Sequence, residues 1–185
     1  VWFAYQLKFN IVETKKISLK KNSQRLKILS PERVSDEINK ILLTESPSIG
    51  FKNLESLNLL EFIIPELIDL KGIDEVEGQT HKDNFYHTLE VLDNISKNTD
   101  NLWLRWAALL HDIGKAPTKK FDKKIGWTFH GHEYVGSKMV KKIFKRLKLP
   151  LNETLKYVQK IVMMSSRPII TVSYTHLTLP TTLTV

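Results

Sequence analysis

The stretch LWLRWAALLHDIGK, residues 102–115, decides the fold of this chain. It is apolar almost all round, with Arg105 as an interruption, and so predicts a helix over 102–113 that is buried at the centre of a domain. An apolar stretch of this length is too short to cross a bilayer. Gly114 stands where a helix C-cap is expected, which places His111 and Asp112 at the C-terminal end of the buried helix.

Amphipathic helices are predicted on both sides of this stretch. Apolar residues recur at helical spacing over 84–97, directly upstream, and over 136–148, downstream. Asn152 is placed to cap a last helix. No convincing strand occurs before residue 170, so the predicted fold class is all-α.

The N-terminal part reads as a series of short helices. The Ser-Pro pairs at 30–31 and 46–47 are helix start signals, with proline at the first helical position. Pro65 bends or ends the apolar run 59–64. Residues 71–80 contain two glycines and are the expected boundary between two domains.

Composition narrows the class of protein. With 42% hydrophobic and 26% charged residues, the chain is soluble globular material. Its net charge of +8 suits a polyanionic partner. The absence of cysteine excludes disulfides and thiolate metal sites. We expect no signal peptide, because Lys8 and Asn10 interrupt the apolar start, and no membrane partner; a cytoplasmic location is the expectation.

The last residues differ in character from the rest. Residues 172–185 (VSYTHLTLPTTLTV) have five threonines, no charged residue and strand-like alternation. This pattern favours a tail of non-native origin outside the fold; a genuine edge strand or polar tail is the alternative.

The pair His111-Asp112 is the first candidate site. Burying an imidazole and a carboxylate costs several kcal/mol unless they pair or bind a cation, and a helix C-terminus favours a cation. Nitrogen and oxygen donors suit Mn, Fe, Zn or Mg. Further histidines are available at His87, His130 and His132. A lone His-Asp pair is more often a structural hydrogen bond than a metal site.

A second candidate surface is a row of lysines on the predicted helix 136–148. A charged outer face is usually only solvated, and the alternative is a surface that follows RNA phosphates without sequence preference. The row consists of Lys138, Lys141, Lys142, Lys145 and Lys148.

Three segments resemble the HD domain of metal-dependent phosphohydrolases, in the form appended to bacterial tRNA nucleotidyltransferases: HTLEVLDN (87–94), AALLHDIGKAPTK (107–119) and FHGHEYVGSKM (129–139). Three upstream segments are similar to the helical neck and body of the CCA-adding and poly(A)-adding enzymes of that class: FAYQLKFNI (3–11), LKILSPERVSDEINKILL (26–43) and LLEFIIPELIDLKGI (59–73). The resemblance implies a neck and body segment over 1–75, an HD domain over 76–171 and the tail over 172–185.

The resemblance also implies roles for single residues. His87 matches the first metal histidine, His111 and Asp112 match the HD pair, and Lys115 matches a lysine that contacts phosphate. Asp112 and Lys115 are thus the implied catalytic residues. His132 matches a histidine that some HD proteins use for a second metal or for phosphate. His130 is either a further ligand or a polar loop histidine. Glu32, Arg33 and Glu37 match a short motif that implies bracing of the neck helices.

The departures from the family are equally informative. Family members begin with a head domain that has a glycine-rich loop and a DxD carboxylate pair, and nothing here resembles it. Trp2 stands where the family commonly has arginine. HD sites also use a final downstream aspartate, whereas the last aspartate here is Asp122. The metal site is therefore expected to be one ligand short.

The implied function is that of a piece of a tRNA nucleotidyltransferase. Its partners would be tRNA and, in the whole protein, CTP and ATP; its HD domain would use a divalent metal to hydrolyse small phosphoesters such as 2′,3′-cyclic phosphates. The chain alone is expected not to transfer nucleotides. Two alternatives stay open: a stand-alone HD phosphohydrolase with a helical cap, and a non-catalytic tRNA-binding scaffold.

Overall fold

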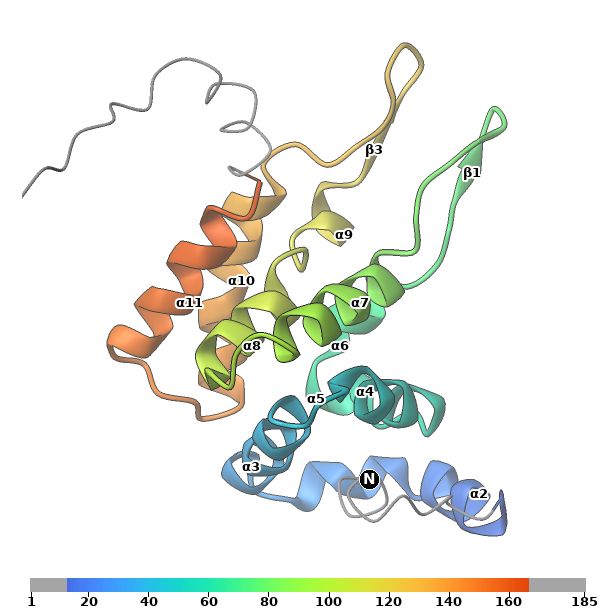
Figure 1. Cartoon of the computed structure of the whole chain (residues 1–185). Helices are drawn as coiled ribbons and strands as arrows, with labels where there is room; N and C mark the ends of the chain where they lie inside the picture. The colour runs from blue at the N-terminus through green and yellow to red at the C-terminus, as the bar shows by residue number, and fades with distance from the viewer. Residues whose placement is uncertain (1–12, 167–185) are drawn as a thin grey trace, which may run out of the picture.

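The computed structural model describes residues 13–166, and the expectations for 3–11, Trp2 and 172–185 lie outside this part of the chain. The N-terminal half of the described chain is a series of short helices (Figure 1). These are α2 (Glu13–Lys21), the 3-10 helix η1 (Ser23–Ile28), α3 (Pro31–Leu42), α4 (Pro47–Ser56), α5 (Leu60–Ile63) and α6 (Pro65–Ile68).

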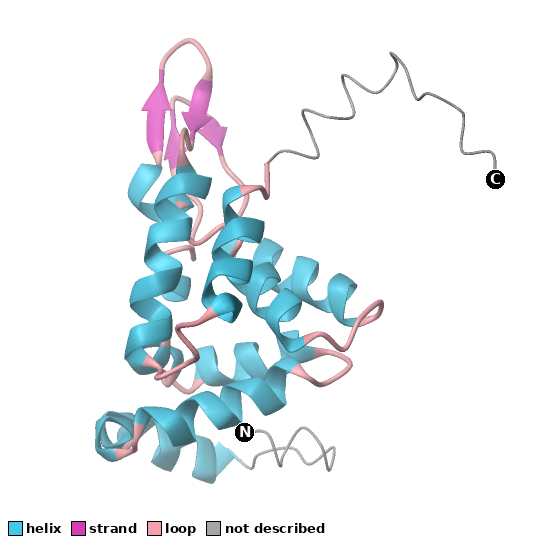
Figure 2. Ribbon diagram, turned by 90° about the vertical axis from the view of Figure 1, so that its left-hand side faces the viewer, coloured by secondary structure: helices cyan, strands magenta, loops and turns pink. Residues whose placement is uncertain are grey.

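The other half is a helical bundle that carries two hairpins at one end (Figure 2). Its helices are α7 (Asn84–Ser96), α8 (Leu102–Leu110), α9 (Lys115–Thr118), α10 (His132–Arg146) and α11 (Glu153–Met163). The hairpins pair β1 (Glu75–Val76) with β2 (Gln79–Thr80) and β3 (Lys120–Asp122) with β4 (Gly126–Thr128). The all-α fold class is confirmed, because all four strands are short and lie outside the core.

Local start signals act as the sequence predicts. The hydroxyl of Ser30 accepts a hydrogen bond from the backbone N–H of Arg33 at 3.4 Å, and Pro31 takes the first position of α3. The side chain of Asn152 accepts from the N–H of Thr154 at 3.0 Å at the start of α11. Pro65 ends α5 at Ile63 and begins α6.

The two hairpins correct the expectation that no strand precedes residue 170. Glu77 and Gly78 both have positive φ, 52° and 75°, as a two-residue turn of type I′ requires. In the second hairpin the carboxylate of Asp122 accepts the N–H groups of Lys124 and Ile125, and Gly126 has φ 86°. Strands of two or three residues are too short to show the alternation by which a sequence predicts strands.

Helix α8 lies at the centre of a continuous core, between α7, α11 and α3. Trp106 and Leu109 are fully buried, and burying one such side chain contributes about 1.5–3 kcal/mol. The core extends from Ile38 in α3 to Val162 in α11, so the N-terminal helices and the bundle share it. No helix within residues 13–166 combines the length and hydropathy that a bilayer crossing requires.

The end of α8 differs from the prediction in two ways. The helix ends at Leu110 rather than at residue 113, because residues 111–114 form tighter turns in which Ile113 bonds to Leu110 and Lys115 to Asp112. Gly114 is not a left-handed C-cap, since its φ is −80°. A Cβ there would lie 2.0 Å from the carbonyl oxygen of His132, so a close approach of α10 requires the glycine.

Candidate metal centre

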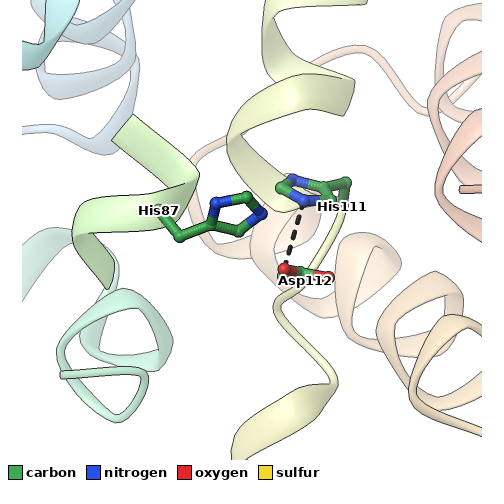
Figure 3. Close-up of side chains that lie close together, drawn as sticks. All are labelled: His87, His111 and Asp112. Atoms are coloured by element: carbon green, nitrogen blue, oxygen red, sulfur yellow. Dashed lines mark ion pairs between the residues drawn. The ribbon is translucent and has the colours of Figure 1, made fainter. Parts of the chain in front are cut away.

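Three predicted side chains meet where α7 passes the end of α8. His87 extends from the first turn of α7, and His111 and Asp112 lie in the turn that follows α8. One ligand atom from each residue lies within 4.8 Å of the others (Figure 3). The structure therefore brings together an imidazole pair and a carboxylate from α7 and from the turn that follows α8.

Asp112 is the centre of this cluster and is 3% exposed. Its Oδ2 lies 3.2 Å from His111 Nε2 and 2.7 Å from Lys115 Nζ. Its Oδ1 lies 3.7 Å from His132 Nε2. Burial raises the pKa of Asp112, but the hydrogen bonds and positive charge of His111 and Lys115 outweigh it and hold the pKa well below its ordinary value. The buried carboxyl group is therefore ionised and can attract a cation.

Two backbone carbonyls fix the histidine rings. His111 Nδ1 lies 2.8 Å from the carbonyl oxygen of Ala108, in the last turn of α8, and His132 Nδ1 lies 2.9 Å from that of Phe129. Because a carbonyl oxygen can only accept, Nδ1 is the donor in both rings, and Nε2 is the ring nitrogen that faces Asp112. A hydrogen bond at the other ring nitrogen is the usual way in which a protein orients a metal-binding histidine.

His87 completes the arrangement from the opposite side. Burial lowers its pKa, and the negative charge of Asp112 offsets this only in part, so the ring is neutral at neutral pH. Its ring centre lies 5.9 Å from that of His111, and the two ring planes are inclined at 66° to each other. A neutral imidazole facing a carboxylate is the form of histidine that binds a metal.

The donor set fits a divalent ion. Two imidazole nitrogens and one carboxylate oxygen are borderline-hard ligands that suit Zn, Fe or Mn, and the carboxylate also accepts Mg. The cluster lies just beyond the C-terminal end of α8, where the helix dipole adds partial negative charge. A third histidine, His132, also lies beside Asp112, with its Nε2 3.7 Å from Asp112 Oδ1.

Other predicted residues lie apart from the cluster. His130 is exposed in the loop before α10 and is not one of the three clustered residues. Arg33 and Glu37 line an apolar cavity of about 210 Å³ beneath α3, and Glu32 is exposed. Among the described residues, the ion pair of Glu37 is with Lys40 on the same helix, at 2.7 Å.

The lysine row forms an exposed face on α10. Lys141, Lys142 and Lys145 are solvent-exposed, and Lys138 lies over the ring of Tyr134 at 5.2 Å. The predicted end of this helix at residue 148 is wrong, because α10 ends at Arg146. Lys148 follows the helix in a left-handed turn with φ 54°. Lys148 is exposed but is not on the helix itself.

Sequence reasoning missed Asn84. The side-chain oxygen of this residue, one turn before His87, accepts a hydrogen bond from Lys115 Nζ at 3.4 Å. Its position three residues before the candidate ligand His87, on the same helix face, is the local signal that marks it as a neighbour of the site, although spacing does not show its bond to Lys115.

Comparisons with known proteins agree with this architecture. Residues 8–70 match the family described as the probable RNA and SrmB-binding site of polymerase A, and residues 84–177 match the HD domain family. An A-adding tRNA nucleotidyltransferase of Deinococcus radiodurans is 40% identical over 129 residues, which are 68% of this chain and 30% of that protein. A multifunctional CCA protein of Shewanella frigidimarina is 39% identical over 131 residues, 70% of this chain and 31% of that protein.

The chain thus spans about 30% of the length of these relatives. The match to the HD domain family covers more than half of the residues of this chain and includes His87, His111 and Asp112. The RNA-binding match covers the helices that precede this domain. The chain belongs to the HD domain family, and a segment that matches the RNA-binding family precedes its HD domain, as expected of a piece of a tRNA nucleotidyltransferase.

Proposed function

We propose that this chain supplies the tRNA-holding helices and a metal-dependent phosphohydrolase site of a tRNA nucleotidyltransferase. The observation that carries the hydrolase half is the buried, ionised Asp112, with His87 and His111 within 4.8 Å. The boundary between the two parts is proposed within residues 71–83, between the two family matches. Transfer of nucleotides from CTP and ATP to the 3′ end of tRNA is assigned to parts of the relatives that this chain does not span.

Asp112, His87 and His111 would hold the metal in this proposal. A divalent ion there would polarise a phosphoryl oxygen and lower the pKa of a bound water. The ammonium of Lys115, 2.7 Å from Asp112, would offset the negative charge of a phosphoester. His132 Nε2 points into the same space and would orient a phosphate oxygen or hold a proton. The expected substrates are small phosphoesters such as 2′,3′-cyclic phosphates.

Replacing Asp112 with asparagine is expected to weaken Mn²⁺ binding at least about 10- to 100-fold, the usual cost of losing an interaction at a metal site. The substitution keeps the shape of the side chain and removes its charge. Isothermal titration of the full chain with Mn²⁺ measures the affinity. Any hydrolysis of a 2′,3′-cyclic nucleotide should disappear with it.

Asp122→Asn is the matched control, because Asp122 is exposed at the end of β3 and is not one of the three clustered residues. It should bind Mn²⁺ like the unaltered chain. Equal binding by the unaltered chain and Asp112→Asn would assign the cluster a structural role. It would favour the non-catalytic scaffold over the hydrolase.

Charge reversal of Lys141 and Lys145 together is expected to weaken tRNA binding. The salt dependence should also flatten, by about one unit of log–log slope per lost phosphate contact. Both lysines are exposed on α10. Filter binding of tRNA at several salt concentrations measures both quantities, with the pair Lys156 and Lys160 on α11 reversed as a control of equal charge. If both pairs have equal effects, the lysines of α10 form only a solvated face.

A further inference from the structure

Lys115 already occupies the position of a cation in this site. Its Nζ lies 2.7 Å from Asp112 Oδ2, although the side chain is only 20% exposed. Lysine heads are rarely held this far from water unless an opposite charge compensates them. The buried carboxylate and the half-buried ammonium therefore stabilise each other.

A divalent ion bound to the same carboxylate would conflict with this pairing. His111 Nε2 and Lys115 Nζ both approach Oδ2, at 3.2 Å and 2.7 Å. A metal placed between these groups would stand next to a positive charge in a site with little water to screen it. Like charges at such separations repel strongly when they are buried.

The surroundings offer the displaced ammonium a second position. Asn84 Oδ1 lies 3.4 Å from Lys115 Nζ. The ring of Phe129 lies 5.7 Å from the same atom, within the range of a cation–π contact. Asn84 and Phe129 are neutral, so they can hold the ammonium of Lys115 when Asp112 binds a metal ion instead.

We propose that Lys115 is an internal counter-cation that a metal must displace from Asp112. Lys115 thereby stabilises the metal-free chain and lowers its metal affinity. The inference rests on the proposed metal site. It assigns Lys115 a function in the metal-free protein in addition to its implied contact with phosphate, and it makes metal loading a competition between two cations.

Lys115→Met tests this, because methionine keeps the unbranched length and removes the charge. Mn²⁺ affinity, measured by titration of the full chain, is expected to rise about 10- to 100-fold, the range in which changes beside metal ligands act. The melting temperature of the metal-free chain should fall, and its increase on addition of Mn²⁺ should grow. Lys115→Arg, which keeps the charge, should stay close to the unaltered chain.

Lys119→Met is the matched control. Lys119 pairs with Asp74 and lies over Trp127 between the hairpins, so its loss affects stability without reaching the cluster. Its Mn²⁺ affinity should not change. A Lys115→Met chain that is less stable and binds Mn²⁺ no more tightly overturns the inference and leaves Lys115 a structural residue. If neither the unaltered chain nor Lys115→Met binds Mn²⁺, the proposed metal site fails as well.

Discussion

Replacing Arg105 with methionine is expected to lower the free energy of unfolding by roughly 2–6 kcal/mol, since each buried carbonyl left without a donor costs roughly 1–3 kcal/mol. Arg105 is 1% exposed in the middle of the core. Its guanidinium donates to the carbonyl oxygens of Leu42 at 2.6 Å and Ser96 at 3.0 Å, both within buried surroundings. It also donates to those of Thr44 and Thr99.

These acceptors explain why a charged residue is tolerated at this position. Leu42 is the last residue of α3 and Ser96 is the last residue of α7. The C-terminal carbonyls of a helix lack partners within the helix and carry partial negative charge. One guanidinium therefore caps two helix ends and joins the N-terminal helices to the bundle.

Urea unfolding followed by circular dichroism measures the effect. Arg146→Met is the matched control, because Arg146 pairs with Glu66 at 2.5 Å while its side chain is 39% exposed. An exposed ion pair contributes about 0–1 kcal/mol. If both substitutions lower stability equally, the buried carbonyls find other donors and Arg105 does not hold the helix ends.

Elements governed by local chemistry could be predicted from the sequence. Helix starts at Pro31, Pro47 and Glu153 follow from proline geometry and capping side chains, which involve residues only a few positions apart. The apolar periodicity of α7 and α10 depends on a single helix facing a core. The central position of α8 could be predicted because its residues are apolar on nearly every side, so no side of the helix is suited to contact with solvent.

Contacts between distant residues could not be predicted in this way. The sequence marked Arg105 as an interruption of an apolar run, whereas two of its acceptors are the last residues of α3 and α7. The hairpins hold each other through contacts such as Trp127 Nε1 to the carbonyl oxygen of Gln79, at 3.0 Å across 48 positions. No local pattern encodes such pairs.

The candidate site also combines features that local sequence predicts with contacts between distant residues that it does not. His111 and Asp112 were evident from adjacent residues at the end of an apolar helix, while His87 was assigned by its match to a family motif. That the three lie together follows from the packing of α7 on α8. The hydrogen bond from Lys115 to Asn84 depends on the turn after α8 and could not be read from spacing alone.

Gly114→Ala is expected to destabilise the chain by about 3 kcal/mol or more, at or above the upper end of typical overpacking costs. The added Cβ would lie 2.0 Å from the carbonyl oxygen of His132 and 2.6 Å from the backbone nitrogen of Gly136. Both atoms belong to the backbone of α10, so no side-chain rotation relieves the collision. The helix itself would have to move, and His132 would move away from Asp112 with it.

Gly131→Ala separates this collision from ordinary glycine strain. Gly131 lies directly before α10 with φ 72°, and a Cβ there meets no atom within 4 Å. Its cost should therefore be the left-handed strain alone, roughly 1–2 kcal/mol. Thermal and urea unfolding of the two variants compare the costs. A Gly114→Ala chain as stable as Gly131→Ala would show that α10 does not pack this closely on the turn after α8, and the placement of His132 beside Asp112 would fall with it.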